Sequence, residues 1–183
     1  MNYGWMGERV RLVPLDRAKH LQNAQLWMND PTVTRWIKRG DLPITMLAEE
    51  AWFDNASKTR VGEITFAIET LDTNEHIGFS DIHKIDFQHG FASTGTLTGR
   101  TDLWGKGYGT DAARVRTRYA FEVLGLRMLY SQVFAENTAS IKMLQNVGYK
   151  EVGRIPRRYW KRGAWRDVVM LCVEHEVTCE FEL

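Results

Sequence analysis

One loop, Trp104-Gly105-Lys106-Gly107-Tyr108-Gly109-Thr110-Asp111-Ala112, leads directly into a helical pattern that continues to Val123. Its three glycines stand at alternate positions, where a bare backbone can approach a ligand closely and adopt conformations that a Cβ forbids. Free N–H groups and the positive end of the helix dipole attract phosphate oxygens to the start of a helix. Lys106 adds a positive charge at the same place. The sequence therefore predicts a binding site for a pyrophosphate.

The composition indicates one globular domain over residues 1–183, with 44% hydrophobic and 26% charged residues. Its 24 basic and 23 acidic residues give a net charge of +1, which argues against a protein built to bind nucleic acid. The basic run from Arg154 to Arg162 is expected to be a solvated loop or strand. A contact with a cofactor phosphate or with an acidic substrate is the alternative for this run.

The numbers of cysteines and tryptophans indicate the cellular compartment and the character of the protein surface. The two cysteines, Cys172 and Cys179, do not suggest a disulfide framework, which fits a reducing cytoplasm. No apolar run approaches the ~20 residues that span a bilayer, so no membrane association is expected. The seven tryptophans exceed what a core of this size needs. Some are expected to line a cleft or an interface, as in a homodimer.

Hydrophobic periodicity predicts an α+β domain. Strands are expected over residues 9–13, 62–69, 77–85, 91–98, 128–135, 149–154 and 168–174. Helices are expected over residues 18–26, 45–57, 112–124 and 138–147, with a short helix from residue 32. Asp16 and Thr45 are the expected N-caps of the first two long helices. Short loops favour an antiparallel meander over residues 62–98, and one strand–helix–strand crossover follows it.

Two other phosphate sites compete for the glycine loop. A P-loop needs four residues between its first glycine and Gly-Lys, whereas Gly99 and Gly105 are separated by five, and no magnesium ligand or other metal site is indicated. A dinucleotide fingerprint fits Gly107 to Ala112, with Glu136 as the ribose-binding acid. That fold needs several parallel strand–helix–strand units, and this chain offers one crossover after an antiparallel meander. Neither alternative therefore accounts for the whole chain.

Four stretches in order resemble the GNAT N-acetyltransferases, and within them the RimJ/RimL-like branch, which acetylates protein N-termini. The loop from Trp104 to Ala112 carries the small residues of the family motif [Q/R]-x-x-G-x-[G/A] at Gly107 and Gly109, with Trp104 where Gln or Arg is usual. The second family stretch appears as Asn137-Thr138-Ala139-Ser140, a helix, and Gly148-Tyr149. Trp27-Met28-Asn29-Asp30-Pro31 and Arg162-Gly163 with Trp165-Arg166-Asp167-Val168 also match the branch.

The resemblance implies a GNAT fold, with a mixed sheet of about seven strands that splays near its middle, and acetyl-CoA as the cosubstrate. Backbone N–H groups from about Gly105 to Thr110 are implied to hold the pyrophosphate, and pantetheine is implied to lie between residues 91–98 and 128–135. Asn137 is implied to bond pantetheine, and Ser140 to lie near the sulfur. The implied cofactor-binding residues are Leu97, Trp104, Gly105, Lys106, Gly107, Tyr108, Gly109, Thr110, Asn137 and Ser140.

The expected reaction is direct attack of a neutral primary amine on the acetyl thioester, which needs a base, an acid for the thiolate and a donor to the oxyanion. Many family members use a Tyr as the acid where this chain has Leu144, so Ser140 is the substitute implied by RimL-like enzymes. Tyr159 stands where those enzymes have a Glu base. A phenol is a poor base at neutral pH, so Asp81, His83 and Glu136 stay open as alternatives.

The leading hypothesis is an acetyl-CoA-dependent N-acetyltransferase whose acceptor is a protein N-terminus or a small-molecule amine. The sequence does not name that amine. A CoA-binding module without transferase activity is the alternative, because the usual Tyr and Glu of the family are missing. An RNA-associated protein that uses the Arg154–Arg162 run is a third hypothesis, and the balanced net charge argues against it.

Overall fold

Eight strands form one mixed sheet in the computed structural model of the chain, which describes residues 5–38, 40–58 and 60–175. The strands are β1 (Trp5–Met6), β2 (Val10–Val13), β3 (Glu63–Thr70), β4 (His76–Asp86), β5 (Phe91–Thr98), β6 (Met128–Phe134), β7 (Lys150–Lys161) and β8 (Ala164–Glu174). Their order across the sheet is β1-β2-β3-β4-β5-β6-β8-β7. All neighbours are antiparallel except β5 and β6, which are the two ends of the predicted crossover.

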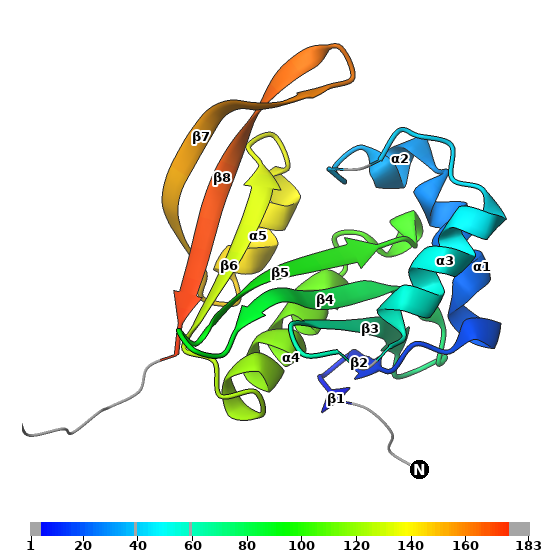
Figure 1. Cartoon of the computed structure of the whole chain (residues 1–183), viewed down its shortest axis with the longest axis horizontal. Coiled ribbons are helices and arrows are strands. Elements are labelled where there is room, and N and C mark those ends of the chain that lie inside the picture. The colour runs from blue at the N-terminus through cyan, green and yellow to red at the C-terminus, as the bar shows by residue number, and fades with distance from the viewer. Residues whose placement is uncertain (1–4, 39, 59, 176–183) are drawn as a thin grey trace, which may run out of the picture.

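The helices lie on opposite faces of this sheet (Figure 1). They are α1 (Arg17–Met28), α2 (Pro31–Thr34), α3 (Met46–Ala56), α4 (Tyr108–Glu122) and α5 (Thr138–Gln145), with a 3-10 turn over Thr101–Leu103. Helices α1 and α3 bury Trp27 and Phe53 against Phe79 of β4 on one face. Helix α4 buries Val115 against Ile77 of β4 on the other face. The meander therefore has a helical cover on both sides.

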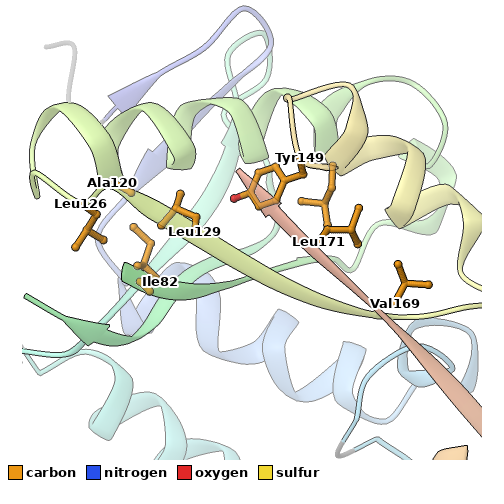
Figure 2. Close-up of a cluster of buried hydrophobic side chains, with 9 residues drawn as sticks. Ile82, Ala120, Leu126, Leu129, Tyr149, Val169 and Leu171 are labelled. Atoms are coloured by element: carbon orange, nitrogen blue, oxygen red, sulfur yellow. The ribbon is translucent and has the colours of Figure 1, made fainter. Parts of the chain in front are cut away.

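A buried cluster joins the crossover helix to the strands on both sides of it (Figure 2). Its members are Ile82, Ala92, Ala120, Leu126, Leu129, Leu144, Tyr149, Val169 and Leu171. Tyr149, the aromatic residue of the Gly-aromatic pair, is 2% exposed. This cluster fixes β4, β6 and β8 relative to α4, and so it holds the frame around the glycine loop.

The predicted order of elements is confirmed, most boundaries agree to within two residues, and the larger differences are in α4, β7 and β8. Helix α4 begins at Tyr108 instead of residue 112, because Gly107 is a left-handed N-cap (φ 89°) and the helix starts directly after it. The last two strands are longer than predicted, because Arg162 (φ 50°) and Gly163 (φ 73°) form a tight turn that lets β7 and β8 pair along their length. The two-residue strand β1 adds an eighth strand to the expected seven. The side chains of Asp16 and Thr45 cap α1 and α3, as predicted.

A buried polar network lies between α1 and the sheet. His20 Nε2 lies 3.2 Å from Glu69 Oε1, and the Arg11 guanidinium bonds the other oxygen of Glu69 at 2.6 Å. His76 Nε2 lies 2.9 Å from the Gly78 carbonyl. Burial lowers the pKa of His76 from 6.5 to about 3 and also lowers the pKa of His20. The fold therefore holds both imidazoles in their neutral form.

Acid is expected to destabilise the protein through these histidines. Because the folded state keeps His76 neutral, its contribution to stability is full above pH 6.5 and is lost as the pH falls toward 3. The free energy of unfolding should fall by up to about 1.4 kcal/mol per pH unit in that window from this one group. Urea unfolding between pH 4 and 7 measures the slope. His76→Gln should flatten it, whereas His89→Gln, at an exposed histidine, should keep it; equal slopes in both variants would remove His76 from this role.

Candidate active site

The sheet opens between its two parallel strands. β5 and β6 pair only over Phe91↔Met128, Ala92↔Leu129 and Ser93↔Tyr130. β5 then continues to Thr98 and β6 to Phe134 without further pairing between them. In Figure 1 the two arrows diverge beyond this point. The splay that the family resemblance implies is therefore present, with its apex after Ser93.

Two hydroxyl groups end the ladder at the apex. Thr94 Oγ1 lies 2.7 Å from Ser131 Oγ and donates to the Tyr130 carbonyl at 3.2 Å. Ser131 Oγ donates to the Thr94 carbonyl at 3.2 Å. These bonds stand where backbone bonds of a continued ladder would form. Neither residue could be predicted from the sequence, because a lone Thr or Ser in a strand carries no signal until the register of the two strands is known.

The open edge of β5 is formed by alternate residues. The Leu97 carbonyl lies against Gly78 of β4, so the backbone of Leu97 faces β4. Backbone groups of successive residues point to opposite edges of a strand, so Thr96 and Thr98 face the gap. The Thr98 carbonyl accepts a 2.8 Å hydrogen bond from Trp104 Nε1. Thr96 is thus the residue of β5 whose backbone is turned to the gap in the middle of the splayed segment, whereas the family resemblance implies Leu97 as the cofactor-binding residue of this strand.

The glycine loop lies where β5 passes into α4. Gly105 (φ 75°) and Gly107 (φ 89°) both have left-handed backbones. Across the chain that the structure describes, no carbonyl or carboxylate accepts from the N–H groups of Gly105, Gly107, Tyr108, Gly109 or Thr110. A Cβ at Gly105 would meet nothing within 4 Å, so the space above the loop is open. Open space and unused donors at a helix start fit a pyrophosphate group.

Two charged groups complete the electrostatics of this loop. Lys106 is exposed beside it. Arg9 also lies there, with its Nε 3.7 Å from the position of a Cβ on Gly107. Arg9 directly precedes β2, about 100 positions earlier in the chain, so no local pattern in the sequence predicts that it lies beside the loop. Asp111, the acidic residue in the first turn, accepts from the N–H groups of Arg9 and Val10 instead of facing the loop. The loop therefore presents positive charge to a ligand.

Asn137 and Ser140 lie at the start of α5. The Asn137 side-chain oxygen accepts the Ser140 N–H at 3.2 Å, so Asn137 is the N-cap of this helix. Its amide nitrogen has no partner within the described part of the chain and keeps its capacity to donate. The Ser140 hydroxyl likewise has no hydrogen bond to a described residue and is partly exposed. Gly109 of α4 lies near α5 as well, with the Met143 sulfur 3.2 Å from its Cβ position.

The four candidate bases, Asp81, His83, Glu136 and Tyr159, occupy three places. His83 Nδ1 lies 2.5 Å from Asp81 Oδ2, and both side chains are about one-third exposed. His83 lines a small cavity of about 80 Å³ together with Ser93, Thr94 and Ser131, the residues of the apex. Glu136 instead pairs with Arg166 at 3.1 Å. The structure thus brings a histidine–carboxylate pair to the apex and engages Glu136 elsewhere.

Tyr159 lies on β7, opposite the end of β6. Its ring packs edge-on against Phe134, with centroids 5.7 Å apart. Lys38 Nζ and the Arg158 guanidinium lie 5.9 and 5.7 Å from the ring centroid. Burial lowers the pKa of Lys38, and the nearby cations Lys84 and Arg158 lower it further. Tyr159 therefore lies in a basic environment, packed against Phe134.

Three further observations concern the cysteines, metal binding and membrane-spanning helices. Cys172 is buried and free, and burial raises the pKa of its thiol; Cys179 lies outside the described residues. No three His, Cys, Asp or Glu side chains in residues 5–38, 40–58 and 60–175 come close enough together to hold a metal ion. None of the described helices is long and apolar enough to cross a membrane.

The comparisons with known proteins agree with this geometry. The chain is 36% identical over 106 residues to the uncharacterized N-acetyltransferase p20 of Bacillus licheniformis, and the match spans 57% of this chain and 58% of that protein. It is 25% identical over 172 residues to the spermidine N(1)-acetyltransferase of Escherichia coli K12, covering 93% and 89% of the two chains. The structure of a Vibrio cholerae spermidine N-acetyltransferase in complex with CoA and spermine has a TM-score of 0.81, at 19% identity and with 90% and 95% coverage. The family model for the acetyltransferase (GNAT) domain matches residues 9–150, and the chain therefore belongs to the GNAT acetyltransferase family.

Proposed function

We propose that this chain transfers an acetyl group from acetyl-CoA to a primary amine by direct attack. One observation carries the proposal: a loop of unused N–H donors leads into a gap between two parted strands. The loop suits a pyrophosphate and the gap suits an extended arm that bonds to a strand edge, which together fit an acyl-CoA. Family membership makes acetyl-CoA the donor.

The donor site is assembled from backbone more than from side chains. Gly105, Gly107, Tyr108, Gly109 and Thr110 would offer N–H groups to the pyrophosphate. Lys106 and Arg9 would supply charge, and Trp104 would hold the end of β5 through Thr98.

The arm would lie between β5 and β6. The backbone of Thr96 would bond it at the strand edge, with the Leu97 side chain behind it, and the free amide of Asn137 would bond it from α5. The Thr96 N–H would also be the donor to the developing oxyanion, since preorganised backbone donors stabilise such a charge.

The base that we favour is the Asp81–His83 pair. An amine must lose a proton to react, and a neutral imidazole oriented by a carboxylate is suited to take it. His83 is bonded to the Asp81 carboxylate and lines the cavity at the apex, where the amine would arrive. Tyr159, implied by the RimL-like resemblance, is the alternative. Ser140 would donate the proton to the departing thiolate.

Replacing Ser140 by Ala should lower turnover about 10-fold or more and leave acetyl-CoA affinity within about 2-fold. Its N–H, which completes the α5 cap, is retained in the variant, so the helix should be unaffected. Steady-state kinetics and calorimetry with CoA separate the two effects. Thr138→Ala, at a neighbouring exposed hydroxyl of the same helix turn, is the matched control. Equal turnover in Ser140→Ala and the native protein would remove Ser140 from the chemistry.

The whole proposal is tested by release of free thiol from acetyl-CoA in the presence of a panel of amines and short peptides. Thiol release with at least one amine, and a product heavier by one acetyl group, supports it. Binding of acetyl-CoA without release across the panel would instead favour a CoA-binding module with no transferase activity.

The family branch, the kind of acceptor, the compartment and the oligomeric state are each supported by a separate observation. The RimJ/RimL-like branch, and with it a protein N-terminus as acceptor, is supported by the motifs from Trp27 and Arg162. The relatives that are named spermidine acetyltransferases support a small-molecule amine as the acceptor. The cytoplasm remains the expected compartment on the basis of cysteine usage. A homodimer is supported by the outward-facing Trp160 and Trp165, which are 62% and 52% exposed.

A further inference from the structure

A second, larger cavity lies beyond the apex, at the end of β6. Its volume is about 350 Å³, and its lining residues are Arg35, Trp36, Phe134, Lys161, Arg162 and Arg166. They come from the segment after α2, from β6 and from the β7–β8 hairpin, whose tip leans toward α2 in Figure 1. Four of the six are cations and the other two are aromatic.

The walls of this cavity are fixed by one carboxylate. Lys161 and Arg162 both bond Asp41, and Arg162 also donates to the Pro31 carbonyl at 3.0 Å. The hydrogen bond from Arg162 lowers the pKa of Asp41, so Asp41 is ionised at neutral pH. Asp41 neutralises one of its two partners and ties the hairpin to the segment that follows α2. Lys161 and Arg162 therefore have a structural role.

The remaining two cations are available to a ligand. Arg166 pairs with Glu136 at 3.1 Å, and the Glu136 side chain is 42% exposed, so water competes for this bond. Arg35 is exposed and bonds no carboxylate within the described residues. Counting Asp41 and Glu136 against the four cations leaves the cavity with two positive charges in excess.

The distance from the apex suits an extended acceptor. Phe134 lies three residues beyond Ser131 on β6, and a strand advances about 3.3 Å per residue, which gives about 10 Å. Tyr159 packs against Phe134, the cations Lys38 and Arg158 lie near its ring, and Lys38 also lines the cavity at the apex. A polyamine reaching this cavity would place its distal ammonium groups among like charges. An anionic group there would meet complementary charge.

We propose that the acceptor is a primary amine that carries an anionic group, a carboxylate or a phosphate, about 10 Å from its amine. Arg35 and Arg166 bind the anionic group while the amine reaches His83 at the apex. This inference rests on the proposed transferase function and names its acceptor class. It differs from the polyamine in the names of the spermidine relatives. A peptide with an acidic residue at its third position and a phosphorylated amino sugar are two sources of the same chemistry.

The test compares acceptors of equal size and different charge. Tripeptide amides ending in Asp, Asn or Lys form one series, glucosamine 6-phosphate and glucosamine form a second, and spermidine is the cationic comparator. The acidic member of at least one series should have a KM lower than its neutral partner by about 3- to 10-fold, and the preference should shrink as salt rises. The series that shows the preference identifies the source of the anion.

The variants assign the preference to this cavity. Arg35→Gln, alone and combined with Arg166→Gln, should raise KM for the acidic acceptor toward that of the neutral one, with kcat at saturation retained. Arg154→Gln is the matched control, because Arg154 is an exposed arginine of the same hairpin that pairs with Glu151 and lies outside the cavity. Calorimetry with CoA should be unchanged in all three variants.

Three outcomes would overturn the inference. If spermidine or neutral amines serve as well as or better than acidic ones while acetyl-CoA is turned over, the acceptor class is wrong and the transferase function stands. If the acidic preference persists in the double variant, the cavity is not its source. If acetyl-CoA binds and no amine releases thiol, the transferase function itself fails and the inference falls with it.

Discussion

Acetyl-CoA affinity is expected to fall by at least about 100-fold when Gly107 is replaced by Val, which corresponds to ~2.7 kcal/mol of binding free energy. Gly107 has φ 89°, a conformation that a β-branched residue strongly disfavours, so the turn should relax and its N–H groups should lose their common direction. The added methyl groups would also project beside Arg9, into the space left for the phosphates. Calorimetry with CoA at fixed salt measures the effect.

Gly125→Val is the control for this variant. Gly125 has φ 67° and a Cβ there would meet nothing within 4 Å, so the backbone strain is similar and no packing is disturbed. It lies after the opposite end of α4, away from the glycine loop. Both variants should lose similar thermal stability, and only Gly107→Val should lose CoA. Unchanged affinity in Gly107→Val, or an equal loss in both variants, would mean that the loop does not bind the cofactor.

The sequence was most informative where the local physics is sufficient by itself. The glycines of the loop were expected to adopt conformations that a Cβ forbids, and the left-handed φ of Gly107 confirms this, although the helix begins at Tyr108 and not at residue 112. Asp16 and Thr45 cap helices for an equally local reason, since their side chains accept N–H groups two or three residues away. The alternation over residues 77–85 indicated a strand for a local reason as well, and β4 confirms it.

The sequence was least informative where two distant segments must be aligned. Whether the backbone of Thr96 or that of Leu97 faces the gap depends on which edge of β5 pairs with β4, and only the register of the meander determines that. The hydroxyl pair of Thr94 and Ser131 depends on the register of two strands joined by a whole helix. The bond between Asp41 and Arg162 joins positions 121 residues apart. No propensity or period encodes these alignments, because tertiary packing sets them.

Replacing His83 by Gln is expected to lower kcat by about 100-fold or more while CoA affinity stays within about 2-fold. Gln keeps a polar side chain beside Asp81 and cannot take up a proton, so the variant removes the base and little else. The acidic limb of the pH–rate profile, which reports a neutral imidazole, should disappear. Asp81→Asn should have a smaller effect on kcat, because the imidazole remains and loses only its orienting carboxylate.

Two further variants distinguish this assignment from its rivals. His89 forms a similar pair with Asp86, at 2.8 Å, and its side chain is 63% exposed, so His89→Gln controls for the loss of a histidine–aspartate bond away from the apex. Tyr159→Phe removes the phenol and keeps the ring that packs on Phe134. If Tyr159→Phe loses the pH-dependent limb and His83→Gln keeps it, the base is the phenol. If only His83→Gln loses it, proton removal takes place at the apex, within reach of the strand edge that would hold the thioester.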